Sequence, residues 1–181
     1  MREEGLLRPD RSGMPGLGNP TMKLIELFEA PKREVVFPRG SQYEAYKQLS
    51  QILESANSSI TIVDNYVDRT LLDMLQPCKE NVAVRVLTNP VRADFKLALE
   101  KFKAQFKRTI EARVHSGDVH DRYVVVDDKD FYSIGASLNR AGDKLTSLVK
   151  YQEPDQIAKL REQIEGIWNR ASSLSGADIA R

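Results

Sequence analysis

The chain has 181 residues, 41% hydrophobic and 29% charged, which is enough to bury a core without disulfides or metal ions. Its formal net charge of +1 argues neither for nor against a polyanionic partner, and its one cysteine, Cys78, excludes an internal disulfide and disfavours a cysteine-based zinc site. The sequence has no apolar run near the roughly 18 residues of a membrane span and no secretory signal pattern. We therefore expect a protein of the cytoplasm.

The N-terminal part begins with a segment that is poor in apolar residues. Glycine and proline interrupt residues 1–21, so we expect a flexible tail there. Short strands are predicted at 23–28 and 34–37. Ser41 then begins a helix, with Glu44 three residues later, which is the spacing of a capping box. One face of this helix carries apolar residues at helical spacing, namely Ala45, Leu49, Ile52, Leu53 and Ala56.

The middle of the chain alternates strand and helix patterns. We predict strands at 59–64, 82–88 and 109–115, separated by helices at about 69–76 and 93–106. Because a strand, helix, strand order implies right-handed crossovers, these three strands should be parallel.

The C-terminal part changes this pattern. Runs at 122–127 and 131–135 are joined by a turn rich in Asp and Lys, which predicts a hairpin. A last helix at 155–171 has Pro154 in its first turn, where proline is tolerated. We therefore expect an α/β fold with a mixed, mostly parallel sheet flanked by helices. Its single domain should span 22–172, with a frayed tail at 173–181.

The start of the hairpin carries a group of side chains suited to a phosphate. Residues two apart on a strand share a face about 6.5 Å apart, so His120 and Arg122 are placed to reach one phosphate. Asp121 and Tyr123 should point the other way. A neutral imidazole can attack phosphorus to form a phosphohistidine, and a guanidinium can clamp two phosphate oxygens.

Three further residues belong to this candidate site. Ser137 and Asn139 are also two apart, and both can donate a hydrogen bond to an anionic oxygen. Asp64 is a candidate because it ends a strand whose carboxyl end should face a crevice. Asp127 lies at the hairpin turn with the opposite parity to His120, so we interpret it first as a turn residue and second as a site residue.

Two other features have competing interpretations. The segment 92–108 is either a contact for nucleic acid or anionic lipid or a solvated helix face. His115 is interpreted as a structural residue that at most borders the site. The basic residues of the segment are Arg92, Lys96, Lys101, Lys103, Lys107 and Arg108.

The hairpin region reads His120-Asp121-Arg122, then four residues and Asp127, and later Ala136-Ser137-Leu138-Asn139. This order resembles the motif of the phospholipase D superfamily. The family pattern has His, any residue and Lys, four residues and Asp, and later Gly-Ser-any-Asn. The chain resembles the small single-motif bacterial branch, and thus one half of the two-motif fold. The resemblance implies that His120 is the nucleophile, assisted by Arg122 and Asp127, with Ser137 and Asn139 on the phosphate.

The resemblance also implies partners. A second copy of the histidine protonates the leaving group, so a chain with one motif would act as a homodimer without metal or other cofactor. The substrate would be a phosphodiester, nucleic acid rather than lipid. The chain departs from the pattern at Arg122 and Ala136, and residues 145–150 hold no carboxylate to orient His120. A non-catalytic module that binds phosphate on nucleic acid or anionic membrane is therefore the alternative.

Overall fold

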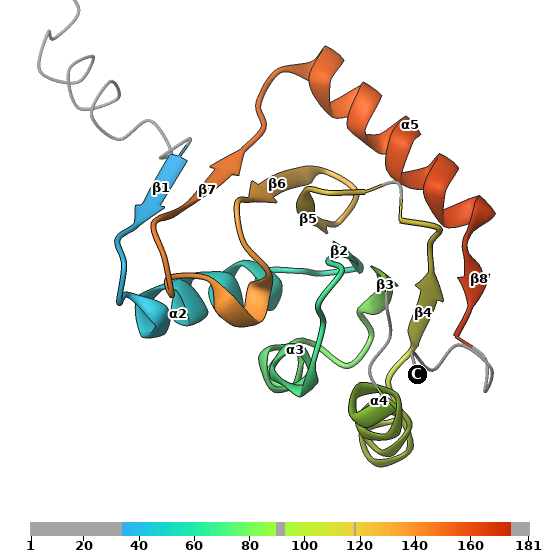
Figure 1. The fold of residues 1–181 in the computed structure, drawn as a ribbon. Coiled ribbons are helices and arrows are strands. Elements are labelled where there is room, and N and C mark those ends of the chain that lie inside the picture. The colour runs from blue at the N-terminus through green and yellow to red at the C-terminus, as the bar shows by residue number, and fades with distance from the viewer. Residues whose placement is uncertain (1–33, 90–92, 118, 175–181) are drawn as a thin grey trace, which may run out of the picture. The chain divides into compact units, whose positions relative to one another are not determined.

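The computed structural model describes residues 34–89, 93–117 and 119–174, which form one open sheet covered by helices (Figure 1). The sheet has eight strands in the order β1-β7-β6-β5-β2-β3-β4-β8. Their bounds are β1 Glu34–Phe37, β2 Ser59–Val63, β3 Ala83–Thr88, β4 Ile110–Val114, β5 Arg122–Val126, β6 Asp130–Ile134, β7 Thr146–Lys150 and β8 Ser172–Ser173.

Helices cover both faces of the sheet. Three lie on one face, α2 (Gln42–Glu54), α3 (Arg69–Leu75) and α4 (Ala93–Phe106), whereas α5 (Pro154–Arg170) lies across the other (Figure 1). A short 3-10 turn, η1 (Leu138–Arg140), follows β6. The predicted α/β class, the parallel β2-β3-β4 unit and the hairpin of β5 and β6 are therefore confirmed.

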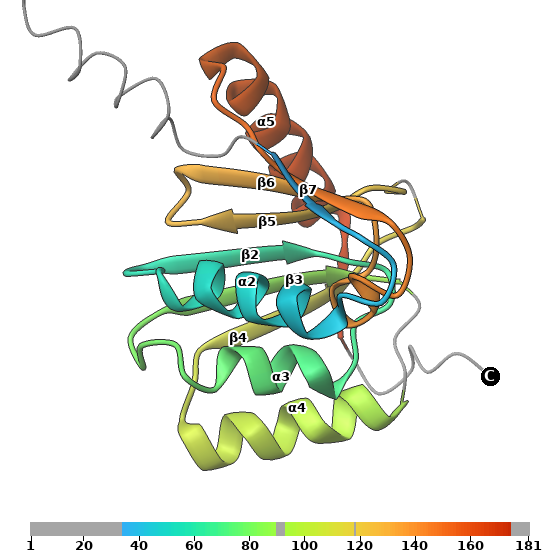
Figure 2. The ribbon, with the colours of Figure 1, turned by 90° about the vertical axis from the view of Figure 1, so that its left-hand side faces the viewer.

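The expected predominance of parallel pairing is wrong. Between described strands, two pairings are parallel and five are antiparallel. Antiparallel pairings predominate even without β7, because the hairpin of β5 and β6 joins β2 antiparallel and β8 pairs antiparallel with β4. Two more come from β7, which the sequence did not predict as a strand and which lies between β1 and β6 (Figure 2). Its only adjacent apolar residues are Leu148 and Val149, too short a run to show a strand period.

Two apolar clusters hold the layers together. The larger one lies under α2, α3 and α4 and includes Leu53, Ile60 and Phe95, each fully buried. The smaller one lies under α5, where Phe131 and Trp168 are buried. All five apolar positions predicted for the first helix are buried.

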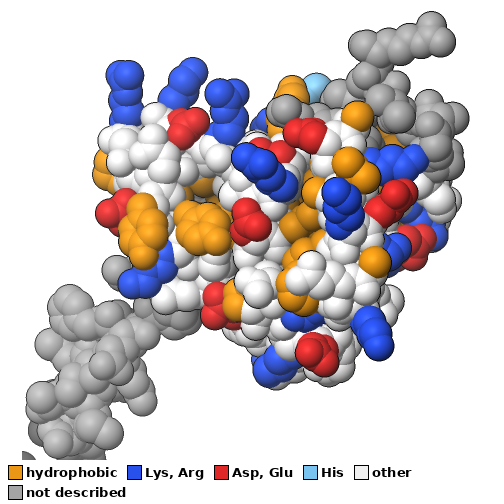
Figure 3. All heavy atoms as spheres, turned by 90° about the horizontal axis from the view of Figure 1, so that it is seen from below, with side chains coloured by type: hydrophobic (Ala, Val, Ile, Leu, Met, Phe, Trp, Pro, Cys, Tyr) orange, Lys and Arg blue, Asp and Glu red, His pale blue; other side chains and the backbone are white. Residues whose placement is uncertain are grey.

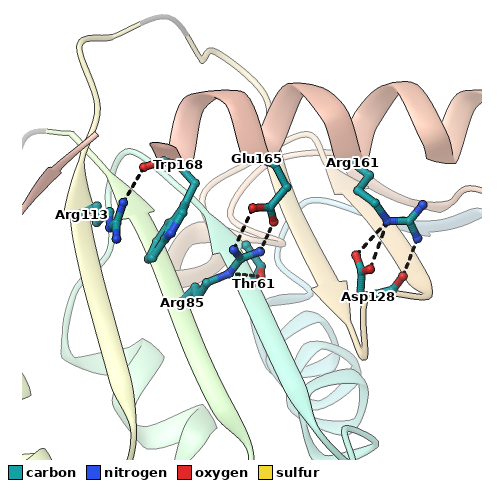
Figure 4. Close-up of polar contacts among 7 residues, drawn as sticks. All are labelled: Thr61, Arg85, Arg113, Asp128, Arg161, Glu165 and Trp168. Carbon is teal, nitrogen blue, oxygen red and sulfur yellow. Dashed lines mark hydrogen bonds and ion pairs between the residues drawn. The ribbon is translucent and has the colours of Figure 1, made fainter. Parts of the chain in front are cut away.

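The indole of Trp168 fixes α5 to the sheet. It lies between two guanidinium groups, with the Cζ of Arg85 at 4.9 Å from the ring centroid and that of Arg113 at 4.3 Å. Arg85 also forms an ion pair with Glu165, and Arg113 donates to the carbonyl oxygen of Trp168 at 2.9 Å (Figure 4). The burial of one indole is thus combined with two cation–π contacts.

The start of α2 differs from the prediction. Ser41 is the N-cap, but its hydroxyl donates to the carbonyl of Pro38 at 2.6 Å and makes no capping bond to the helix. The prediction of a capping box is therefore wrong. Instead the loop between η1 and β7 closes on this end, with the backbone N–H of Gly40 donating to the carbonyl of Gly142 at 2.8 Å. A Cβ at Gly142 would lie 2.6 Å from the carbonyl carbon of Ser41, so only glycine fits.

The chain remains paired to the sheet beyond the last helix. Ser172 and Ser173 form β8, and the N–H of Leu174 donates to the carbonyl of Ala112 at 3.0 Å. The remainder of the expected C-terminal tail lies outside the described residues, as do the expected N-terminal tail and the strand predicted at 23–28.

Candidate phosphate-binding cleft

A cleft of about 830 Å³ opens where β2 ends and β5 begins. The segment after β2, the first residue of β5 and the loop from β6 to β7 form its walls. Its charged lining consists of Asp68, Arg122, Arg140, Asp143 and Lys144. The cations slightly outnumber the carboxylates, so the cleft suits an anion that also carries hydrogen-bond donors.

Arg122 presents its guanidinium to this cleft. Its Nη1 donates to the carbonyl of His120 at 2.9 Å, and its Cζ lies 5.7 Å from the ring centroid of Tyr66. Its Nε is buried and, within the described part of the chain, has no hydrogen-bond partner. A buried N–H without an acceptor is costly, so an anionic oxygen that reached this atom would remove that cost.

Asp64 lies buried behind the cleft at the end of β2, with 1% of its surface exposed. Its carboxylate accepts from the backbone N–H groups of Tyr66 at 2.9 Å and Leu138 at 2.7 Å, and contacts the hydroxyl of Ser137 at 2.8 Å. Burial raises the pKa of Asp64 despite these bonds and the nearby charge of Arg122. Asp64 therefore connects the end of β2 to the loop that carries Ser137.

The polar chain continues from Ser137 toward the cleft. Ser137 Oγ lies 2.7 Å from Asn139 Oδ1, and Asn139 Nδ2 donates to Asp68 at 2.6 Å. One hydroxyl proton cannot serve both Asp64 and Asn139. A proton on Asp64 would supply the missing donor, because Asp64 would then donate to Ser137 and Ser137 would donate to Asn139. Ser137 and Asn139 are thus engaged by two carboxyl groups.

His120 lies beside the cleft but does not line it. Its side chain is exposed, and in the ranges that the structure describes no hydrogen bond or ion pair holds its imidazole. The predicted strand parity does not extend to His120, because β5 begins at Arg122 and only Arg122 of the two lines the cleft. Tyr123 packs against the cluster under α5, and its hydroxyl donates to Asp121 at 3.2 Å. Burial raises the pKa of Tyr123 to about 12, so this phenol stays neutral.

The structure does not bring Asp127 to the cleft. It lies in the turn at the other end of β5, where Asp127 and Asp128 have φ values of 53° and 50° and form a tight hairpin turn. Its carboxylate accepts from the backbone N–H groups of Asn57, Ser58 and Ser59 at 2.7–3.0 Å. These bonds, led by Ser58 and Ser59, hold the pKa of Asp127 well below its usual range. Asp127 fixes the start of β2 to the hairpin.

We expect Asp127→Asn to lower the free energy of unfolding by about 1–2 kcal/mol at neutral pH, since water reaches the turn and moderates the loss. Asn keeps the left-handed backbone. Because the folded pKa lies below the ordinary value of 3.8, the contribution of Asp127 is present above that pH. It is lost as the pH falls through the folded value, so the difference between variant and wild type should shrink in acid.

Urea unfolding at neutral pH and below 3.8 measures this difference. The matched control is Asp128→Asn in the same turn, where the carboxylate makes an exposed ion pair with Arg161. That change should cost about 0.5 kcal/mol or less. Equal losses in the two variants, or a loss that does not change with pH, would contradict the role given to Asp127.

Over its described residues, 93–108, the basic segment is not a continuous cationic surface, and Arg92 lies outside the described residues. Arg108 is buried and donates to the carbonyl oxygens of Gln76, Cys78 and Lys79, which closes the end of α3. The face formed by α2, α3 and α4 shows intermixed basic and acidic side chains with hydrophobic ones between them (Figure 3). A solvated helix face is the better interpretation of this segment. Within the described ranges, no helix has the length and apolar character needed to cross a membrane.

The sequence did not reveal every residue of the cleft. Tyr66 and Asp68 follow β2 directly, and Asp68 accepts from the N–H of Thr70 at 2.9 Å as the N-cap of α3. An Asp just before a helical pattern is a signal for that cap. Arg140 and Lys144 enter the cleft through the fold of the loop from β6 to β7, for which no sequence signal exists.

Comparison with known proteins gives a match at the level of structure. No family model and no curated protein sequence matches the chain. Nuc from Salmonella typhimurium, a phospholipase D family member, superposes with a TM-score of 0.61 at 16% identity over 79% of this chain and 99% of Nuc. NucT from Helicobacter pylori superposes with a TM-score of 0.60 at 13% identity, over 78% of this chain and 98% of NucT.

A third solved structure with this architecture belongs to a chromatin protein. TrmBL2, an archaeal chromatin protein described as showing a novel mode of DNA binding, gives a TM-score of 0.54 at 15% identity. The match covers 86% of this chain and 62% of TrmBL2. The mixed sheet, its helices on both faces and the near-complete coverage of Nuc and NucT agree with one another. The chain therefore has the phospholipase D-like fold.

Proposed function

We propose that this protein is a phosphodiesterase that cleaves a phosphodiester of nucleic acid through a phosphohistidine on His120, and that it acts as a homodimer. Arg122 holds the phosphate in the cleft. The observation that carries the proposal is the buried Nε of Arg122, a donor that lacks an acceptor in the described residues and lies at the wall of a cationic cleft. A phosphate group suits the planar guanidinium of Arg122 best, because two phosphate oxygens can accept from two of its N–H groups.

The lining of the cleft favours nucleic acid over lipid. Its side chains are charged or polar apart from Ala136 and the ring of Tyr66. That ring is half exposed next to Arg122, so it offers a base a stacking surface beside a phosphate. The similarity to a DNA-binding chromatin protein agrees with this choice.

The reaction divides into two displacements at phosphorus. A ring nitrogen of His120 attacks the phosphorus, the bond to the leaving alkoxide oxygen breaks, and His120 of the partner subunit gives that oxygen a proton. Water then attacks the phosphohistidine, its proton passes to the same partner histidine, and the free imidazole is restored. Throughout, Arg122 neutralises the charge on the phosphoryl oxygens. The imidazole of His120 is exposed and makes no hydrogen bond or ion pair with the described residues, which leaves it accessible to a second copy of the chain.

We expect Arg122→Ala to weaken binding of a short oligonucleotide about 30-fold, because a charged, two-pronged donor is lost. Fluorescence anisotropy at fixed salt measures the affinity. Arg140→Ala is the control, since this cation also lines the cleft but its side chain is 75% exposed. It should cost less than about threefold. Equal affinities of wild type and Arg122→Ala would contradict the proposal.

A non-catalytic phosphate-binding module is the second candidate. The observation in its favour is that Asp64 and Asp68 engage Ser137 and Asn139, while no carboxylate of the described residues contacts the imidazole of His120. This candidate requires oligonucleotide binding that weakens steeply with salt and no hydrolysis. Light scattering adds a second criterion, because a strict monomer at high concentration has no second copy of His120 to protonate the leaving group and contradicts the catalytic proposal.

A further inference from the structure

The segment that carries His120 is held at two points by side chains outside the cleft. This segment joins β4 to β5, and the structure describes its residues 115–117 and 119–121. His115 is buried at its start, with 4% of its surface exposed, and its backbone N–H donates to the carbonyl of Thr88 at 3.2 Å. The backbone N–H of Gly117 donates to Nδ1 of His115 at 3.1 Å. Gly117 has a φ of 97°, so the tight turn at this point requires glycine.

These contacts determine where the proton of the His115 ring lies. Since Nδ1 accepts from Gly117, the proton of the neutral imidazole is on Nε2, which lies 2.8 Å from Oδ1 of Asn65. Asn65 Oδ1 accepts this bond, and its Nδ2 donates to the carbonyl of Val119 at 2.7 Å. A reversed amide would place donor against donor and acceptor against acceptor, so the direction of the chain of bonds is fixed.

We infer that Asn65 and His115 are positioning residues for His120, an inference that rests on the proposed function. Val119, whose carbonyl Asn65 holds, immediately precedes His120 and is itself buried under α5. The imidazole of His120 has no bond of its own within the described residues. Two bonds hold the backbone here, one from Asn65 to the carbonyl of Val119 and one from Arg122 to the carbonyl of His120. The first lies outside the cleft, and the orientation of Asn65 is set by His115. Neither residue lines the cleft.

The kinetic test uses three variants of the full chain on a short oligonucleotide substrate. We expect Asn65→Ala to lower kcat about tenfold with KM unchanged, because the nucleophile is misplaced while Arg122 still binds phosphate. The side-chain nitrogen of Gln reaches the position of Nε2, so His115→Gln should retain most of kcat. Asn at 115 can still accept from Gly117 but cannot reach Asn65, so His115→Asn should match Asn65→Ala. Equal kcat in wild type and Asn65→Ala would overturn the inference.

A second readout does not depend on turnover. The chain has only two histidines, so ¹⁵N-histidine spectra resolve both rings. We expect one ring fixed as the Nε2-protonated tautomer, and increased backbone amide mobility at residues 119–121 in Asn65→Ala but not in His115→Gln. An Nδ1-protonated His115, or unchanged mobility in Asn65→Ala, overturns the inference. A wild-type protein that shows no hydrolysis refutes the catalytic proposal, whereas these spectra still decide whether Asn65 and His115 hold the segment.

Discussion

His120→Ala is expected to lower the rate of phosphodiester hydrolysis at least about a thousandfold, the largest effect of any single substitution in this chain. The imidazole is the only group of the protein that bonds to phosphorus in the proposed reaction. Because His120 does not line the cleft, oligonucleotide affinity should change less than about threefold. The loss should therefore lie in kcat, which single-turnover hydrolysis of a labelled oligonucleotide measures.

The control for this experiment lies at the far end of the hairpin. Lys129 is exposed in the turn beside Asp128, away from the cleft, so Lys129→Ala should retain the wild-type rate. Hydrolysis that persists in His120→Ala at the wild-type rate would exclude a phosphohistidine at this residue. A shift in affinity as large as the shift in rate would mean that His120 binds the ground state and does not attack.

Trp168→Ala is expected to lower the free energy of unfolding by about 3–5 kcal/mol, the largest stability effect. The indole is 5% exposed and is the central side chain of the cluster beneath α5. Its removal leaves a cavity and also deprives Arg85 and Arg113 of the ring between them (Figure 4). Neither guanidinium can move into the space without desolvating its charge, so collapse of the cavity is limited.

Urea unfolding followed by far-ultraviolet circular dichroism measures this loss, since Trp168 is the only tryptophan and the variant has no indole fluorescence. Trp168→Phe is the matched variant. It keeps an aromatic ring between the two arginines and should lose about half as much stability. A loss below about 1 kcal/mol in Trp168→Ala would show that α5 contributes little to the fold.

The sequence predicted the elements whose apolar pattern is long. Helix α4 has the predicted bounds because Phe95, Leu99 and Phe102 repeat at helical spacing over its whole length. Strand β7 escaped prediction because its burial depends on β1 and β6 pairing with it from both sides. Register between strands distant in sequence is a tertiary property, and short amphipathic runs do not encode it locally.

The cleft could be predicted only in part for a similar reason. Residue spacing placed Ser137 and Asn139 together, but not the carboxyl groups that engage them. Asp64 and Ser137 are 73 positions apart, and their contact follows from the position of β2 in the sheet. The same holds for Asp127, whose residue type fits the family motif while its contacts are with the start of β2.

The most direct test of the phosphate site is the Nε–H signal of Arg122. In protein labelled with ¹⁵N-arginine, Arg122→Lys assigns this resonance by its absence. We expect a dinucleoside monophosphate to shift it downfield in a saturable manner, because the buried N–H gains a charged acceptor. The signal of the exposed Arg140 should move little. If the ligand binds and the Arg122 resonance stays in place, the cleft does not recognise phosphate through this residue and the central claim is wrong.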